Sequence, residues 1–370
     1  MVYLKVMSIR IQRTLACTSA WFRTPHDVVE DEVMLDRDGT AAPATLVRPR
    51  NSSRDLPAWV VMHGISRPGR AHEQLVRFTR ALAHAGIATI IPDVPEWRDL
   101  DLAPGLTTPS IAAAIQWLRG SGVVRDEPIG VVGFSFGAPH VIAAWADARV
   151  CDDIGAACGF GGYCSMRRTF HFMMTGQHNA GSTTEYLRPD PYGRWIIAAN
   201  YLPFVPGHED ATDVAEALRT LAKHAGDVGA ASWDPVYGPK IDELRRSVAE
   251  ERRTLFDLFA PRSGAPVADA EAAAMGEQLE EAARRTEPAI DPTPALAEVT
   301  GTVHLIHGRR DHLIPYSESE LLTSALSGGT ARLTITRLFG HSAQDPFPLF
   351  ASAVEIPRFT RALGEVLAAL

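Results

Sequence analysis

The chain has 370 residues, of which 46% are hydrophobic and 22% are charged, a balance typical of a folded globular protein. Its formal net charge of −8, with no basic block, argues against binding to nucleic acid or to an anionic membrane surface. Four cysteines, Cys17, Cys151, Cys158 and Cys164, are too few for a disulfide framework in so long a chain, so we expect free thiols and a reducing compartment.

Residues 1–27 are expected to form an N-terminal extension. The stretch MVYLKVMSIRIQRTLAC is apolar and ends at a cysteine, as an export signal would, but Lys5, Arg10 and Arg13 interrupt the apolar run that such a signal requires. No window approaches the roughly 20 consecutive apolar residues of a membrane span. We therefore expect a cytoplasmic protein with no membrane span.

From residue 28 onward, short apolar runs alternate with amphipathic ones, which is typical of βαβ units and a mostly parallel sheet. A helix is predicted at 71–85, with Gly86 leaving it in the left-handed conformation. A second helix is predicted to begin at Ser110 as its N-cap. Strands are predicted at 55–64, 87–93, 128–134 and 153–160.

After residue 161 the strand signals give way to helical periodicity, and strand patterning returns at 302–308 and 331–338. The apolar, aromatic segment 167–176 is expected to pack in the core of this region or to wall a substrate pocket. We therefore predict a core of residues 28–161 and 298–370, interrupted by a helical insertion at 162–297. Three apolar stripes mark its amphipathic helices: Val214, Leu218 and Leu221; Ile241, Leu244, Val248, Leu255 and Leu258; Met275, Leu279 and Ala282.

The stretch GVVGFSFGAPH, residues 130–140, places Ser135 between two glycines where a buried strand meets a helix. The spacing from Gly133 to Gly137 fits the G-x-S-x-G motif, in which a serine on a sharp strand-to-helix turn exposes its hydroxyl above the sheet edge. Glycines at these positions let the strand and helix backbones approach. A bare motif can arise by chance in a chain with 29 glycines, so the strand and helix around it decide the interpretation.

A serine nucleophile needs a base and an acid that orients the base. IHGRRDHLIP (306–315) places Asp311 after a late strand, and RLFGHSAQDP (337–346) places His341 after the next one. This order resembles that of the α/β-hydrolase superfamily, with its mostly parallel sheet flanked by helices. The resemblance implies that Ser135 is the nucleophile, Asp311 the orienting acid and His341 the general base. Asp93 is the main rival for the acid.

Acyl transfer also needs hydrogen-bond donors for the oxyanion. The N–H of Phe136 lies at the start of the helix after Ser135, where the helix dipole favours an anion. The turn MHGIS (62–66) looks like the HG motif of the superfamily, which implies the N–H of Ile65 as the second donor. His63 is expected to be a structural side chain of this turn rather than a base.

The sequence predicts no metal and no cofactor: His304 and His307 point to opposite faces of a strand, and no P-loop or GxGxxG is present. The expected function is a serine carboxylesterase that cleaves small or medium acyl esters, with the insertion as a cap. A thioesterase or C–C bond hydrolase on the same triad is the alternative enzyme, and a ligand-binding module on this fold is the alternative outside catalysis. The expected partner is a small-molecule ester, and the oligomeric state stays open, a homodimer included.

Overall fold

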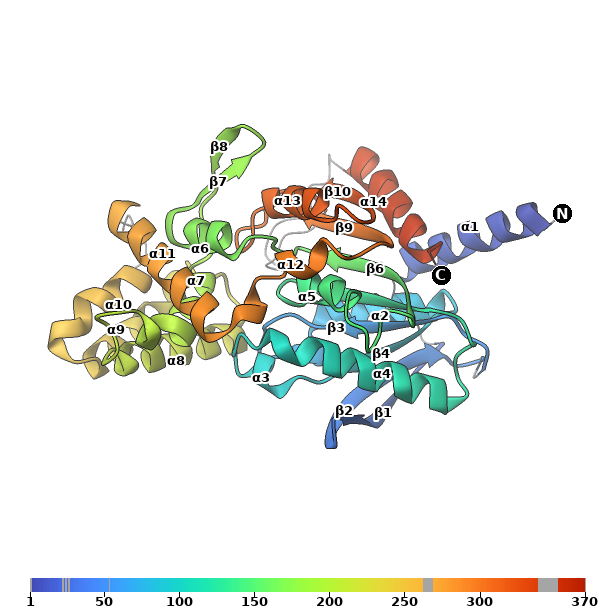
Figure 1. The fold of residues 1–370 in the computed structure, drawn as a ribbon, viewed down its shortest axis with the longest axis horizontal. Helices are drawn as coiled ribbons and strands as arrows, with labels where there is room; N and C mark the ends of the chain where they lie inside the picture. Colours follow the sequence, from blue (N-terminus) through green and yellow to red (C-terminus); the bar gives the residue numbers. More distant parts are fainter. Residues whose placement is uncertain are drawn as a thin grey trace.

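The computed structural model describes residues 2–21, 23, 25, 27–52, 54–261, 269–338 and 352–369. Its centre is an eight-stranded sheet with the order β1-β2-β4-β3-β5-β6-β9-β10 (Figure 1). Strand β2 pairs antiparallel with both of its neighbours, and every other pair in the sheet is parallel. The strands are β1 Val28–Arg37, β2 Thr40–Pro49, β3 Ala58–Met62, β4 Ala88–Pro92, β5 Ile129–Phe134, β6 Ile154–Phe160, β9 Thr302–Gly308 and β10 Thr330–Thr336.

Helices cover both faces of this sheet, because its central strands are buried on both sides and expose apolar side chains alternately to each. One face packs against α1, α2 and α14 through side chains that include Trp59, Val61 and Val132. The opposite face packs against α4, α5 and α13 through Val60, Val131 and their neighbours. These helices are α1 Val2–Trp21, α2 Glu73–His84, α4 Thr107–Ser121, α5 Gly137–Ala144, α13 Ser317–Ala325 and α14 Ser352–Leu367.

The structure confirms the six predicted strands, with the first one shortened to β3. Helix α2 also matches its prediction, and Gly86 after it has a φ of 83°. The prediction that Ser110 caps the next helix is wrong. Helix α4 begins at Thr107, and Ser110 lies inside it, where its hydroxyl donates to the Leu106 carbonyl at 2.7 Å.

The hairpin β1–β2 and helix α1 were not predicted. The hairpin turns at Asp38 and Gly39, whose φ values of 51° and 82° are those of the tight turns that join antiparallel strands. Helix α1 packs its last turns on α2 and α14, with Cys17 buried among them. None of the helices in the described part of the chain combines the length and the apolar character needed to cross a membrane.

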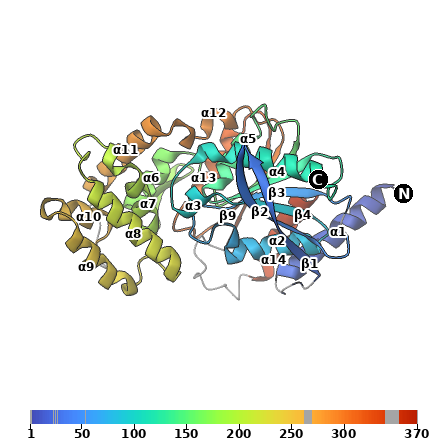
Figure 2. The same ribbon diagram turned by 90° about the horizontal axis from the view of Figure 1, so that it is seen from below.

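The segment between β6 and β9 is mainly helical: helices α6 to α11 lie together at the left of Figures 1 and 2, beside the sheet, whereas α12 lies against α5 of the core. We keep the name helical insertion for residues 162–297, whose exact boundaries remain a prediction. Short helix α3, Pro95–Arg98, lies on the core beside it. The insertion contains α6 Met166–Thr175, β7 Gln177–Ala180, β8 Thr183–Tyr186, α7 Pro191–Tyr201, α8 Thr212–Val228, α9 Gly238–Ser247, α10 Arg253–Phe259, α11 Asp269–Thr286 and α12 Thr293–Leu296.

Two of the three predicted stripes are buried faces of single helices, in α8 and α11. The second stripe is divided between α9 and α10, because Val248 leaves α9 with an extended ψ of 140° and a short 3₁₀ helix, Glu250–Arg252, precedes α10. In α10 the fully buried residues are Phe256 and Phe259 rather than the predicted leucines. The hairpin β7–β8 also contradicts the expectation that strands are absent from this region.

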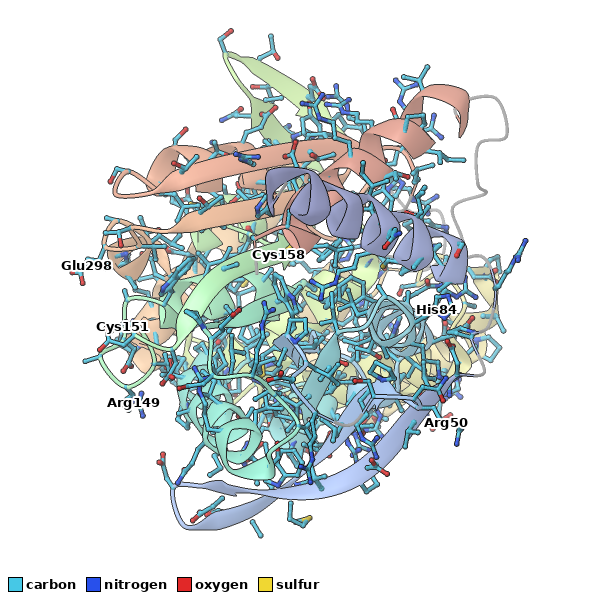
Figure 3. The ribbon with its side chains drawn as sticks, turned by 90° about the vertical axis from the view of Figure 1, so that its right-hand side faces the viewer. Arg50, His84, Arg149, Cys151, Cys158 and Glu298 are labelled. Carbon is cyan, nitrogen blue, oxygen red and sulfur yellow. The ribbon has the colours of Figure 1, made fainter. Side chains whose placement is uncertain are left out.

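All four cysteines are free, as predicted. Cys158 lies within β6, whereas Cys151 lies in the loop that precedes this strand (Figure 3). Burial raises the pKa of the Cys17 and Cys164 thiols to about 12, which keeps them in the thiol form at neutral pH.

Candidate active site

Ser135 occupies a strained turn between the end of β5 and the start of α5. Its φ of 54° is unusual for a residue with a side chain. The turn is held by the Ser135 N–H, which donates to the Phe160 carbonyl at 2.7 Å, and by the Ser135 carbonyl, which accepts from the Ala138 N–H at 3.0 Å. The predicted strand-to-helix turn is therefore present, with the serine half-buried at its apex.

Both glycines of the motif are required by close backbone contacts. A Cβ atom at Gly133 would overlap the carbonyl group of Gly137. One at Gly137 would lie 2.8 Å from the carbonyl oxygen of His63. The second contact shows that the HG turn lies directly against the start of α5.

The HG turn also touches the serine itself. A Cβ atom on Gly64 would lie 3.0 Å from the Ser135 Cβ and 3.6 Å from its Oγ. Because Ile65 follows Gly64 directly, the structure brings the predicted oxyanion turn beside the predicted nucleophile. Phe136, the other predicted donor, is the residue before α5.

His63 fixes the shape of this turn. Its Nδ1 lies 2.8 Å from the Gly64 carbonyl oxygen, and its Nε2 accepts from the Val94 N–H at 3.3 Å. A carbonyl oxygen can only accept and an N–H can only donate, so Nδ1 carries the single ring proton. Burial lowers the pKa of His63, which favours this neutral form. The ring therefore has a structural role, as predicted.

Asp311 lies in the loop that follows β9 and is 2% exposed. Its Oδ1 accepts from the N–H groups of Leu313 and Ile314, each at 2.9 Å, and its Oδ2 lies 3.3 Å from the Nε2 of His307. Strands β5, β6 and β9 are parallel neighbours, so Asp311 and Ser135 follow strands that end at the same edge of the sheet. His341, the predicted base, lies outside the described residues.

An eight-stranded, mostly parallel sheet with helices on both faces carries a serine on a strained turn at the carboxyl end of a central strand. This is the arrangement of the nucleophile elbow in α/β-hydrolases. The chain has the α/β-hydrolase fold.

No family model matches the chain, and no curated protein matches it. Among solved structures it is similar to Est1E from Butyrivibrio proteoclasticus, at 14% identity and a TM-score of 0.48 over 90% of this chain and 98% of that one. It is also similar to an acylaminoacyl peptidase of Pyrococcus horikoshii, at 11% identity and a TM-score of 0.49 over 92% and 41%. A dienelactone hydrolase from Anabaena variabilis matches at 14% identity and a TM-score of 0.45 over 92% and 98%. The fold assignment rests on the sheet and the elbow.

Asp93, the rival acid, is engaged with arginines in this α/β-hydrolase fold. Its Oδ2 accepts from Arg98 at 3.2 Å, and its Oδ1 lies 3.7 Å from the Nε of Arg70. Asp93 is 3% exposed, so two arginine cations flank a buried carboxylate in the loop after β4. This surrounding favours Asp311 over Asp93 as the acid.

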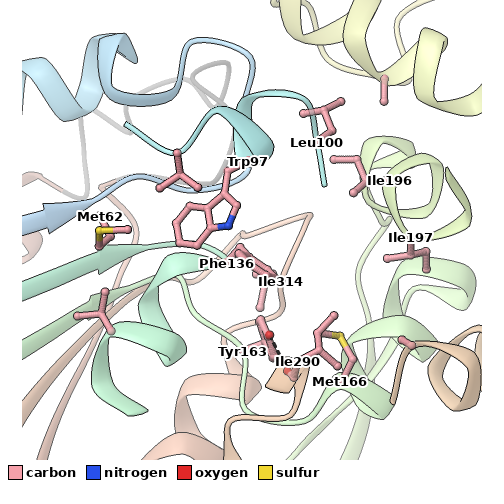
Figure 4. Packing of buried hydrophobic residues seen from close by; sticks show 14 of the residues in the cluster. Met62, Trp97, Leu100, Phe136, Tyr163, Met166, Ile196, Ile197, Ile290 and Ile314 are labelled. Carbon is pink, nitrogen blue, oxygen red and sulfur yellow. Dashed lines mark hydrogen bonds between the residues drawn. The ribbon is translucent and has the colours of Figure 1, made fainter. Parts of the chain in front are cut away.

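Apolar side chains from both parts of the chain converge beside the elbow (Figure 4). Trp97 of α3, Phe136 before α5 and Ile314 after β9 come from the core, whereas Met166 and Ile196 come from the helical insertion. The rings of Trp97 and Phe136 meet edge to face, 5.3 Å apart. The predicted segment 167–176 forms most of α6, and its side chains Phe170, Phe172 and Met174 are buried in the interior of the helical insertion.

A buried hydrogen-bond chain joins α5 to the insertion. The Tyr163 hydroxyl donates to the Ile290 carbonyl at 2.8 Å, so it accepts from the Nε2–H of His140 at 2.6 Å. Burial lowers the pKa of His140 to about 3, which keeps the ring neutral.

Two side chains that support the site were not identified from the sequence. The sequence suggests His307 only as a candidate metal ligand, yet its Nδ1 lies 2.7 Å from Ser319 Oγ, and its Nε2–H donates to the Ile314 carbonyl at 2.9 Å and lies 3.3 Å from Asp311 Oδ2. Glu318, fully buried, accepts from the N–H groups of Cys164 and Ser165 and from Arg168, which fastens the start of α6 to α13. Within the described residues, no group of three or more His, Cys, Asp or Glu side chains is arranged to hold a metal ion.

Proposed function

We propose that this chain is a serine hydrolase, a carboxylesterase that cleaves small or medium acyl esters through an acyl-enzyme on Ser135. The observation that carries this proposal is the strained φ of 54° at Ser135, with Gly64 of the HG turn packed against its side chain. Backbone strain costs about 1–3 kcal/mol per residue and clusters at functional sites.

In the proposed reaction, the Ser135 Oγ attacks the ester carbonyl carbon and His341 accepts the hydroxyl proton. The N–H groups of Ile65 and Phe136 stabilise the oxyanion, and Asp311 orients His341. The C–O bond to the alcohol then breaks, and His341 returns the proton to the leaving alcohol. Water, activated by the same histidine, hydrolyses the acyl-enzyme to the carboxylic acid and the free serine.

The proposed preference for small or medium acyl groups rests on the apolar side chains beside the elbow. Trp97 and Phe136 on the core face Met166 and Ile196 on the helical insertion (Figure 4). An apolar surrounding favours an acyl chain over a charged group. We infer that the insertion acts as a cap that contributes one wall to the acyl-binding region.

A panel of p-nitrophenyl esters of graded chain length tests this function. We expect turnover by the wild-type protein, and a loss of about a thousandfold or more in kcat for Ser135→Ala. Ser324→Ala is the matched control, because Ser324 is exposed on α13 and, among the described residues, its hydroxyl bonds only to the Glu320 carbonyl. Equal turnover in the Ser135→Ala and Ser324→Ala proteins would refute the proposal.

A further inference from the structure

Arg67 lies two residues after Ile65 and connects the HG turn to the helical insertion. Its Nε donates to Asp227 at 3.3 Å, and Asp227 lies at the end of α8, 160 residues away in sequence. Its Nη1 donates to the Arg98 carbonyl at 3.0 Å and to Asp99 at 3.4 Å. One side chain therefore joins the turn, the loop after α3 and a helix of the insertion.

The main chain of Arg67 is held as well. The Nε of Arg98 donates to the Arg67 carbonyl at 3.4 Å, so each arginine binds the carbonyl group of the other. Gly226 of α8 lies directly over the Arg67 side chain, since a Cβ atom there would be 2.6 Å from the Arg67 Cγ. The helix thus contacts the aliphatic part of Arg67 while Asp227 binds its guanidinium.

Asp99 also links helix α8 to the loop after α3. Lys223 of α8 donates to the Asp99 carboxylate at 2.9 Å, and this hydrogen bond lowers the pKa of Asp99. Exposed ion pairs contribute little to stability one by one. Here their role is to fix positions, because one network joins Arg67 after the HG turn, the loop after α3 and helix α8.

We propose that Arg67 is a positioning residue that couples the docking of the helical insertion to the placement of the Ile65 N–H. This inference rests on the proposed function. Oxyanion stabilisation depends on donors held in place before the reaction, so a turn released from α8 lowers the rate of the chemical step more than it weakens substrate binding. The insertion would then act in two ways: it contacts the acyl group, and through Arg67 it sets the position of the Ile65 N–H.

The test compares Arg67→Ala, Arg67→Lys and Arg219→Gln. We expect Arg67→Ala to lower kcat about tenfold with KM within twofold, short of the 10²–10³-fold that follows removal of an oxyanion donor. The inhibition constant of a trifluoromethyl ketone, which forms a tetrahedral adduct with the serine, should rise in step with the loss in kcat. Arg67→Lys keeps a cation at this position and should restore part of the rate.

Arg219→Gln is the matched control. Arg219 also joins α8 to the loop after α3, through the Asp99 carbonyl at 3.1 Å and Asp101, but within the described residues it forms no hydrogen bond to Arg67 or to the HG turn that precedes Arg67. Its kcat and the ketone inhibition constant should stay within twofold of wild type. An equal loss in the Arg219→Gln and Arg67→Ala proteins would overturn the proposal, because docking alone would then explain both.

Hydrogen exchange separates this inference from the proposed function. Backbone amides of residues 62–67 should exchange faster in Arg67→Ala than in wild type or Arg219→Gln, whether or not esters are cleaved. If wild type cleaves no ester, the proposed function fails while the exchange result still decides whether Arg67 holds the turn. Unchanged exchange in a folded Arg67→Ala protein overturns the role of Arg67. Asp227→Asn removes the negative charge of the partner on α8 and should shift exchange in the same direction. This variant takes the place of Arg67→Ala if that protein does not fold.

Discussion

Replacing Gly64 with alanine should damage catalysis more than folding. The new Cβ would lie 3.0 Å from the Ser135 Cβ and 3.2 Å from the Phe134 carbonyl oxygen. Carbon atoms in contact prefer separations of about 3.5–4.0 Å, so the HG turn must move away from the elbow by roughly 0.5–1 Å. Ile65, the next residue, moves with it.

A displacement of this size is large for an oxyanion hole. A misplacement of about 1 Å can cost about 100-fold in rate, so we expect kcat to fall about 10- to 100-fold. Crowding of this kind costs roughly 1–3 kcal/mol of unfolding free energy, which leaves the protein folded if its stability is ordinary.

Ester hydrolysis and urea unfolding, measured on the same preparations, test this expectation. Gly120→Ala is the control, because Gly120 lies in α4 and a Cβ there would meet nothing within 4 Å. That change should leave kcat unaltered and raise the unfolding free energy by up to about 1 kcal/mol. A folded Gly64→Ala protein with kcat within threefold of wild type would refute the placement of the turn against the nucleophile.

Three further predictions concern the acid, the pH dependence and the insertion. Asp311→Asn should lower kcat by about 10⁴-fold, whereas Asp93→Asn should lower the free energy of unfolding, measured in urea, and leave kcat largely unchanged. A loss of kcat in a folded Asp93→Asn protein, with kcat retained in Asp311→Asn, would reassign the acid. The pKa of His140 is about 3 in the fold and near 6.5 when unfolded, so its contribution to stability is complete above pH 6.5 and is lost as the pH falls toward 3. Urea titrations should show that wild type loses about 2 kcal/mol more than His140→Gln between pH 7.5 and pH 5, and parallel curves would contradict this. Replacing residues 165–295 with a short Gly/Ser linker should shift kcat/KM across the ester panel while Ser135 still reacts with a fluorophosphonate probe, and an unchanged chain-length profile would show that the insertion faces elsewhere.

The central strands and the elbow could be predicted from the sequence because their signals are local. A buried parallel strand is an uninterrupted apolar run, and the spacing of Gly133, Ser135 and Gly137 is itself the geometric requirement of the turn. The roles of His63 and the left-handed Gly86 also follow from short-range context. Local chemistry was therefore enough for the part of the site nearest to the serine.

Other elements were missed for physical reasons that differ. The hairpin β1–β2 does carry a local signal, because Asp38-Gly39 is typical of a tight turn between antiparallel strands. Strands β7 and β8 are four residues each and largely exposed, so they show no apolar alternation.

The supporting contacts have no local signal at all. Glu318 binds Cys164 across 154 residues, and Arg67 binds Asp227 across 160. Only the folded chain brings such partners together, which is why they could not be predicted.

Trapping the acyl-enzyme tests the central claim most directly. The wild-type protein, quenched in acid during turnover of a p-nitrophenyl ester and digested, should yield the peptide that contains Ser135 with the added mass of the acyl group. The same peptide from Ser135→Ala should carry no addition. Steady turnover by wild type with the acyl group on another residue, or with a fluorophosphonate adduct found away from Ser135, would contradict the account.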